Sequence, residues 1–357
     1  MNVFVFILLL LAILGLLDKI MNNQLGLVDS FDKGIQSMGT LALSMMGFYC
    51  VAVTFVNQNV DMIFAFSQSL HFDPNVIVGC LLAPDLGGYS IVNSLSTSQE
   101  LTLFIGLILT STIGTVISFQ LPLFFTALNK EDIQPYIKGL IYGMIVVPFV
   151  LIPLGMYLHI KNLLILLLPV FLICIILVLG LTFLKKQTMI FLTYFGEFIR
   201  ILSLIFFCFV IIKVYNDDFS LTSITLIQES LLIVLKCTMI VIGSMILCDL
   251  CLKYLSSIID KMAKRLNVNN YSIIGLFLQM ATSVAMFPIF SKMDTKGKII
   301  NGAFSVSGAY VIGAQLGFAS SVTSSQGVML YIITKLCAGF LAIMLACVFQ
   351  EKVEKKD

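Results

Sequence analysis

The sequence has few charged residues and no long polar segment. Charged side chains make up 11% of the 357 residues, whereas apolar residues make up 59% and the mean hydropathy is +1.05. This composition excludes an ordinary soluble domain and indicates a protein that crosses a membrane many times. The net charge is only +2 and the basic residues lie in short loops, so nothing indicates a nucleic-acid partner.

Catalytic and metal-binding motifs are also missing from the sequence. It contains no Gly-x-Ser-x-Gly, no His-Glu-x-x-His and no phosphate-binding glycine loop. The nine cysteines are scattered, and the one close pair, Cys248 and Cys251, has no second Cys or His pair to complete a metal site. An intramembrane acid pair is not favoured either, because Ala281 stands where a partner for Asp85 would be expected. We therefore predict no enzyme activity, no cofactor and no metal site.

Apolar segments run through the whole chain. At about 20 residues a crossing, the sequence offers eleven of them: 3–17, 35–56, 74–96, 101–127, 139–159, 162–184, 189–214, 227–252, 271–291, 298–319 and 327–349. The first lacks the basic start and cleavage site of a signal peptide, so we expect it to be retained. Amphipathic stretches at 60–70 and 256–266 precede the interrupted segments 74–96 and 271–291 and are predicted to lie along the membrane interface.

The first interrupted segment carries a carboxylate within Leu81 to Tyr89. Pro84 removes a backbone donor, Gly87 and Gly88 tolerate unusual backbone angles, and Asp85 is costly in hydrocarbon unless it faces protein, water or a ligand. Breaks of this kind commonly hold the substrate sites of transporters. The alternative is a kinked packing helix in which Asp85 pairs with a neighbouring lysine.

The second half of the sequence repeats features of the first half at an offset of 196 residues. Gly47 matches Gly243, Gly79 matches Gly275 and, after a slip of one residue, Gln120 matches Gln315. The order of the segments is the same in both halves. We predict an all-α polytopic membrane protein with one domain of two five-segment repeats, 1–160 and 189–350, a linking span at 162–184 and a charged cytoplasmic tail at 351–357.

The lysine and arginine residues favour a particular topology. If both interrupted segments are re-entrant hairpins, the loops carry 16 Lys and Arg on one side of the membrane and 2 on the other. If all eleven segments cross, the two sides carry nearly equal numbers of Lys and Arg. The positive-inside rule therefore favours hairpins, with the N-terminus outside and the C-terminus inside. The two halves then have opposite orientations, as in transporters built from inverted repeats.

Short blocks of sequence resemble one known family. They are Leu16 to Ile20, Leu25 to Leu27, Gly34 to Met46, Leu81 to Tyr89, Met286-Phe287, Lys292 to Asp294, Lys296 to Lys298, Asn301 to Ser307, Leu316 to Phe318 and Lys335-Leu336. In this order they resemble the ethanolamine permeases of bacterial ethanolamine-utilisation operons (EutH-type). The resemblance implies a multi-spanning protein of the bacterial cytoplasmic membrane that moves ethanolamine.

The sequence departs from the family pattern at three places. Pro84 stands where the family usually has Asn. At the second hairpin, Thr282-Ser283 and Val284-Ala285 stand where the family usually has a paired Asn followed by Ile-Pro. Ala314-Gln315 stands where the family usually has Asp-His. Fold and transport class therefore carry over better than substrate identity.

The resemblance leads to an expected binding site for a small amino alcohol, taken up by alternating access between the two hairpin tips. Asp85 would bind the ammonium group, Tyr89 would add a cation–π face, and the substrate hydroxyl would meet polar side chains of the second half. The expected substrate-binding residues are Asp85, Gly87, Gly88, Tyr89, Gln120, Thr282, Ser283 and Gln315. For each hydroxyl or amide the alternative is a role in close helix packing.

The expected partners are a small-molecule substrate and membrane lipid, and the sequence leaves open whether the chain forms a homo-oligomer. Two other functions also stay open. One is transport of a different small polar solute, and the other is a membrane sensor or assembly protein that transports nothing.

Overall fold

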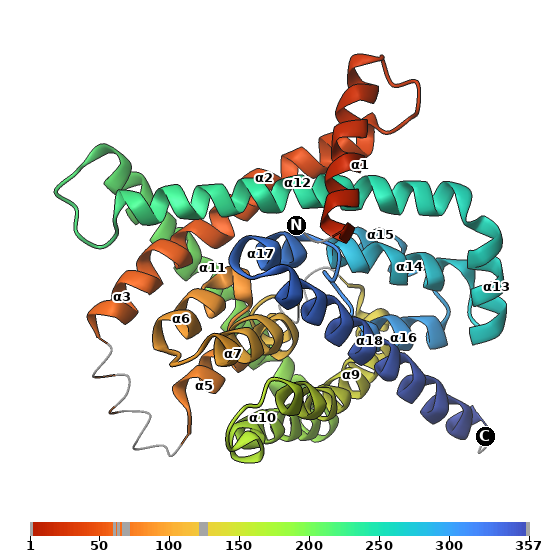
Figure 1. Ribbon diagram of the computed structural model, residues 1–357. Coiled ribbons are helices and arrows are strands. Elements are labelled where there is room, and N and C mark those ends of the chain that lie inside the picture. The colour runs from red at the N-terminus through yellow and green to blue at the C-terminus, as the bar shows by residue number, and fades with distance from the viewer. Residues whose placement is uncertain (1–2, 60–61, 63–64, 66–71, 121–127, 355–357) are drawn as a thin grey trace. The chain divides into compact units, whose positions relative to one another are not determined.

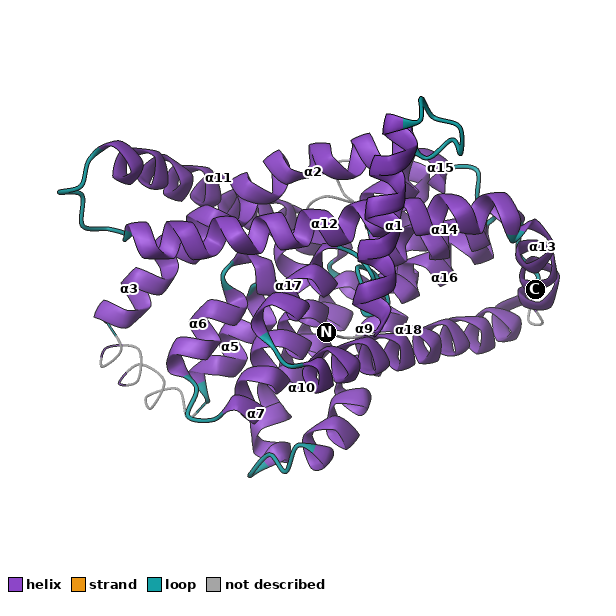
Figure 2. Ribbon diagram, turned by 45° about the horizontal axis from the view of Figure 1, so that its top comes forward, coloured by secondary structure: helices purple, strands orange, loops and turns teal. Residues whose placement is uncertain are grey.

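The computed structural model describes residues 3–59, 62, 65, 72–120 and 128–354, and all of their regular structure is helical, as predicted (Figures 1 and 2). The α-helices are α1 (Val3–Ile20), α2 (Val28–Gly47), α3 (Val53–Gln58), α5 (Pro74–Leu81), α6 (Gly88–Leu95), α7 (Gln99–Leu101), α9 (Lys130–Tyr157), α10 (Leu163–Phe183), α11 (Lys185–Tyr215), α12 (Ile224–Tyr254), α13 (Ser256–Leu266), α14 (Asn270–Ala281), α15 (Phe287–Phe290), α16 (Thr295–Ser305), α17 (Ala314–Val322) and α18 (Ser325–Glu354). Wider π-type helices span Phe48–Ala52, Thr102–Gly114 and Val116–Gln120, and 3-10 turns span Pro84–Leu86 and Ser283–Met286.

Within this described part of the chain, four helices are long and apolar enough to cross a membrane. Their spanning windows are Glu131–Tyr157, Leu163–Gly180, Ile224–Cys251 and Ser325–Phe349. Several of the other predicted spans are divided into shorter pieces. The amphipathic stretch predicted at 256–266 is α13, whereas most of the stretch at 60–70 lies outside the described residues.

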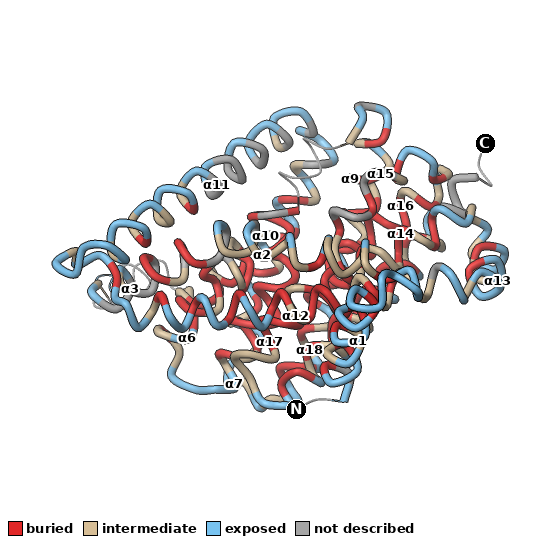
Figure 3. Tube along the Cα trace, turned by 90° about the horizontal axis from the view of Figure 1, so that it is seen from above, coloured by how far each residue is buried: buried red, intermediate tan, exposed pale blue. Residues whose placement is uncertain are grey.

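Large apolar side chains point outward along α10 and α11. Leu164 and Phe183 of α10 are 69% and 77% exposed, and α11 is exposed along much of its length (Figure 3). So large an apolar surface is unfavourable in contact with water, whereas contact with lipid chains is favourable. These helices therefore fit a membrane environment.

The chain folds into two compact units that take segments from both predicted repeats. Unit 1 contains residues 1–37, 124–147 and 237–357, and unit 2 contains residues 38–123 and 148–236. Unit 2 therefore holds the first interrupted segment, and unit 1 holds the second. The repeats proposed from the sequence stay a prediction, because a spatial grouping of segments does not test a duplication.

The helix boundaries agree with an offset of 196 residues. The starts of α2 and α12, of α5 and α14, and of α7 and α16 are each 196 residues apart. Asp73 and Asn269, also 196 apart, cap α5 and α14 by accepting a backbone N–H through a side-chain oxygen. These matched starts support a duplication but do not show how the halves are oriented.

Small residues bring α9 against α16 in unit 1. A Cβ atom on Gly139 would lie 2.0 Å from the carbonyl oxygen of Ile299, and one on Gly143 would lie 2.5 Å from that of Ala303. Only glycine allows the two backbones this close, an arrangement that favours helix association where lipid removes the hydrophobic driving force.

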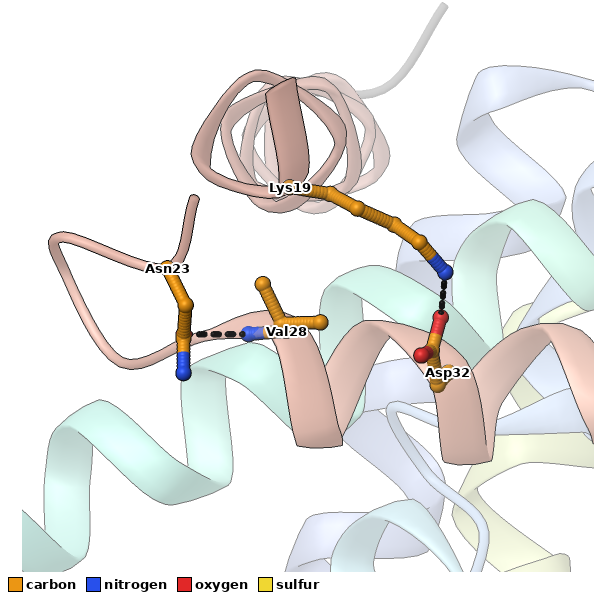
Figure 4. Close-up of polar contacts among 4 residues, drawn as sticks. All are labelled: Lys19, Asn23, Val28 and Asp32. Atoms are coloured by element: carbon orange, nitrogen blue, oxygen red, sulfur yellow. Dashed lines mark hydrogen bonds and ion pairs between the residues drawn. The ribbon is translucent and has the colours of Figure 1, made fainter. Parts of the chain in front are cut away.

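Polar contacts hold the turn between α1 and α2. The Asp18 carboxylate accepts hydrogen bonds from the backbone N–H groups of Leu25 (2.6 Å) and Leu27 (2.8 Å). Lys19 of α1 forms an ion pair with Asp32 of α2, as Figure 4 shows. These contacts therefore fix the charged end of α1 against the start of α2.

Candidate binding sites at two helix breaks

The first break interrupts the chain between α5 and α6, at the place predicted. The helix α5 ends at Leu81, Pro84–Leu86 forms a 3-10 turn that contains Asp85, and α6 begins at Gly88. Gly87 has a φ of 85°, a left-handed conformation that favours glycine. The proline and this glycine explain why the helix stops and restarts here.

The segment that follows satisfies the backbone of this break. The hydroxyl of Ser118 accepts a hydrogen bond from the N–H of Ala83 (3.0 Å) and donates to the carbonyl of Gly114 (2.7 Å). A Cβ atom on Gly114 would lie 2.2 Å from the carbonyl oxygen of Leu82, so the two backbones are in direct contact. Such contacts allow non-helical backbone at membrane depth.

Four of the predicted site residues lie together on this break. Asp85 and Tyr89 are half-buried, and Gly87 and Gly88 are buried between them. Gln120 is buried on a different element, at the end of the helix Val116–Gln120. Unit 2 therefore presents a carboxylate and an aromatic ring at one helix break.

The second break follows α14 in unit 1. Thr282 is extended and half-buried, and Ser283 is fully buried at the start of the 3-10 turn Ser283–Met286. Pro288 lies in the first turn of α15, where a missing N–H is tolerated. The two predicted residues of the second hairpin therefore lie side by side at its break.

The span predicted at 298–319 is not continuous. Residues 306–313 are non-helical between α16 and α17, and they pack against the second break. The N–H of Tyr310 donates to the carbonyl of Gln279 (2.9 Å), and the N–H of Ile312 donates to that of Met280 (3.0 Å). A Cβ atom on Gly313 would lie 1.7 Å from the carbonyl oxygen of Ala281. The prediction was wrong here because it counted apolar length alone, although Ser307, Gly308 and Gly313 are residues that could have indicated a break.

Gln315 lies in the first turn of α17 and contacts a buried lysine. Lys335 of α18 donates to the Gln315 Oε1 atom (2.9 Å), and its ammonium group lies 5.4 Å from the centre of the Tyr331 ring. The Tyr331 hydroxyl donates to the carbonyl of Tyr310 in the non-helical segment (3.0 Å). Lys335 therefore fixes the direction of the Gln315 amide, with its carbonyl oxygen toward the ammonium group.

The two ends of the second interrupted segment are held together. The N–H of Asn269 donates to the Asp294 carboxylate (3.0 Å), the Asn269 side chain donates to the carbonyl of Lys292 (2.8 Å), and the Ser272 hydroxyl donates to Asp294 (2.7 Å). The chain therefore returns to the place where it entered, which supports the predicted hairpin.

The structure thus places the predicted site residues in two sets. Asp85, Gly87, Gly88, Tyr89 and Gln120 belong to unit 2, and Thr282, Ser283 and Gln315 belong to unit 1. The idea that both sets share one site stays a prediction.

A comparison with known protein families gives one match along almost the whole chain. The model of the family described as "Ethanolamine utilisation protein, EutH" matches residues 1–349. The chain belongs to the EutH family. The resemblance predicted from the sequence blocks is therefore confirmed.

Relatives of the EutH chain are similar over nearly their full length. A protein of Listeria monocytogenes named "Probable ethanolamine permease EutH" is 29% identical over 358 residues, covering 100% of this chain and 96% of the relative. One of the same name from Salmonella typhimurium is 25% identical over 90% of this chain and 85% of the relative. The "Uncharacterized protein YxeR" of Bacillus subtilis is 26% identical over 95% of this chain and 92% of the relative. No solved structure matches the chain.

Proposed function

We propose that this EutH protein is a multi-pass permease of the cell membrane that takes up ethanolamine or a similar small amino alcohol. The observation that carries the proposal is the family match over residues 1–349, together with relatives named probable ethanolamine permeases. The two helix breaks, each braced by polar side chains and close backbone contacts, are the kind of element that holds small polar cargo in transporters.

Charge decides how ethanolamine would be oriented. At neutral pH ethanolamine has an ammonium group at one end and a hydroxyl at the other. The ammonium binds Asp85 and the face of Tyr89, with the backbone of Gly87 and Gly88 beside them. The hydroxyl end meets Thr282, Ser283 and Gln315, because the cationic Lys335 beside Gln315 repels an ammonium group. Gln120 lines the path from the first hairpin.

The transport cycle is alternating access. The two repeats have opposite orientations, and one hairpin approaches the central site from each side of the membrane. Rocking of one part against the other then exposes the site to the outside and to the cytoplasm in turn. The matched starts of α5 and α14 and of α7 and α16 support the duplication on which this scheme depends.

A second candidate is transport of a different small polar solute. The observation that favours it is the pair Ala314-Gln315 beside Lys335, because this end of the site carries a positive charge and neutral groups only. A neutral solute rich in hydroxyl groups would fit such an end as well as ethanolamine does.

The test is a counterflow assay with the purified protein in liposomes. Unlabelled ethanolamine inside the liposomes is expected to drive accumulation of radiolabelled ethanolamine, and close amino-alcohol analogues are expected to compete. Liposomes without protein are the control. Competition by a neutral polyol but not by amines would favour the second candidate, and no exchange by a correctly inserted protein would contradict transport of ethanolamine.

A further inference from the structure

A buried glutamine on α14 is held in one orientation by an asparagine on α16. Gln279 is fully buried, and its Nε2 atom donates to the Asn301 Oδ1 atom (2.9 Å). The helices α14 and α16 lie side by side (Figures 1 and 2). Gly275 keeps the crossing close, because a Cβ atom there would lie 2.7 Å from the same Asn301 oxygen.

The other end of Asn301 fixes the direction of this hydrogen bond. Its Nδ2 atom donates to the carbonyl of Ser272 (2.9 Å) and to the carbonyl of Gly297 (2.9 Å). An amide nitrogen can only donate and an amide oxygen can only accept, so Asn301 must present its oxygen to Gln279. Gln279 must then present its nitrogen, and its Oε1 atom faces away from Asn301.

The Gln279 Oε1 atom is buried and has no hydrogen-bond partner among the described residues. The Oγ atoms of Ser283 and Ser307 are also buried without a hydrogen-bond partner among the described residues. All three residues belong to segments that meet in unit 1, since the carbonyl of Gln279 accepts the N–H of Tyr310 in the non-helical segment 306–313. Buried polar atoms in native proteins are nearly always hydrogen-bonded to protein, water or a bound group, so these three atoms have room for a partner that the described part of the chain does not supply.

We propose that Gln279 binds the transported solute, accepting a hydrogen bond from a solute N–H or O–H group at its Oε1 atom. Asn301 is the positioning residue, because it holds the Gln279 amide with its oxygen toward the solute. The ligand class is a small solute that carries ammonium or hydroxyl donors. This inference rests on the proposed transport function and adds a recognition residue to it.

The experiment measures ethanolamine binding to purified full-length protein. Gln279→Met keeps the length of the side chain but removes both the acceptor and the Nε2 donor to Asn301, and we expect it to weaken the Kd for ethanolamine at least tenfold, which corresponds to about 1.4 kcal/mol. Gln279→Glu keeps an acceptor and, when protonated, still donates to Asn301, so we expect a Kd within about threefold of the wild-type value.

Ser305→Ala is the matched control on α16. The Ser305 hydroxyl is equally buried, but it is bonded to the Tyr136 hydroxyl (3.0 Å) and to the carbonyl of Gly302 (2.8 Å). We expect this variant to lower the melting temperature without changing the Kd. An unchanged Kd in Gln279→Met, or an equal loss in Ser305→Ala, would overturn the role of Gln279. Failure of the wild-type protein to bind ethanolamine would instead overturn the proposed substrate.

Discussion

A single carboxylate is central to the proposed recognition of an amine. Asp85 lies on a 3-10 turn between two short helices and is half-buried in unit 2. A charge at the middle of a membrane costs about 2.5–3.5 kcal/mol even on the lenient insertion scale. In the proposed function a cationic solute offsets part of that cost when it binds, and this is the reason proposed for a carboxylate here.

Replacing Asp85 with Asn is expected to keep the protein in the membrane and to abolish most ethanolamine uptake. The amide retains the size and hydrogen bonding of the side chain but cannot neutralise an ammonium group. Uptake of radiolabelled ethanolamine per molecule of membrane protein is the measurement. Asp249→Asn is a matched control, since Asp249 is a half-buried carboxylate within α12 that we place in no site.

Two results would contradict this role of Asp85. Normal uptake by a well-expressed Asp85→Asn protein would show that the charge is not needed. Low abundance with normal uptake per molecule would show that the carboxylate is structural.

At the scale of the helix, the sequence predicted the continuous elements well and the contacts between them poorly. The linking span predicted at 162–184 is α10, and the amphipathic stretch at 256–266 is α13. Both follow from local patterns of apolar residues, which need no knowledge of neighbours. The break within 298–319 depends on groups from other helices, because Ser244 contacts the carbonyl of Ile312 and Tyr331 binds that of Tyr310.

In the candidate site, too, local features could be predicted from the sequence and contacts between helices could not. The helix break at Asp85, Gly87 and Gly88 could be predicted because a carboxylate, a proline and two glycines within an apolar run are a local signal. The role proposed for Gln279 could not be predicted, because it depends on the amide direction imposed by Asn301 from another helix. A single sequence does not reveal which amides meet across a helix crossing.

The crossing of α9 and α16 provides a prediction about stability. Gly139→Ala is expected to lower the melting temperature by several degrees, since its methyl group would lie 2.0 Å from the carbonyl oxygen of Ile299 and overpacking costs about 1–3 kcal/mol. The matched control is Gly39→Ala on α2, where a Cβ atom has no neighbour within 4 Å. Alanine favours a helix over glycine by up to about 1 kcal/mol, so this variant should be as stable as the wild type or more so.

A thiol-reactive dye is the suitable probe for this comparison. The chain contains no tryptophan, whereas Cys50, Cys80, Cys174, Cys237 and Cys248 are buried and become reactive on unfolding. Equal melting temperatures of the Gly139→Ala and Gly39→Ala variants would contradict the close packing of α9 on α16.

At the scale of the whole molecule, the distribution of charge and the hydrogen bonds in unit 1 agree on which loops share a side. The flanks of the second hairpin meet through Asn269 and Asp294. Lys298, just after the hairpin, forms an ion pair with Asp132 of α9 (2.6 Å). The topology with 16 basic residues inside and 2 outside places all of these residues in the cytoplasm.

This topology predicts which introduced cysteines an impermeant thiol reagent can reach in intact cells. Lys261→Cys and Lys292→Cys, on the two flanks of the second hairpin, should react only after the membrane is opened. Gln58→Cys and Thr97→Cys, on the flanks of the first hairpin, should react from outside. All four side chains are exposed, so burial would not protect them.

The native residues Cys208 and Cys337, which are exposed, and Cys251 and Cys347, which are half-buried, would be replaced by serine beforehand, so that the introduced thiols report. Opposite sidedness for the two flanks of either hairpin would show that the segment crosses the membrane. In that case the two repeats would lose their opposite orientations, and alternating access between two hairpin tips would have to be abandoned. Opposite sidedness at the second hairpin would also conflict with the hydrogen bonds that join Asn269 to Asp294, so that pair of labels is the sharper test.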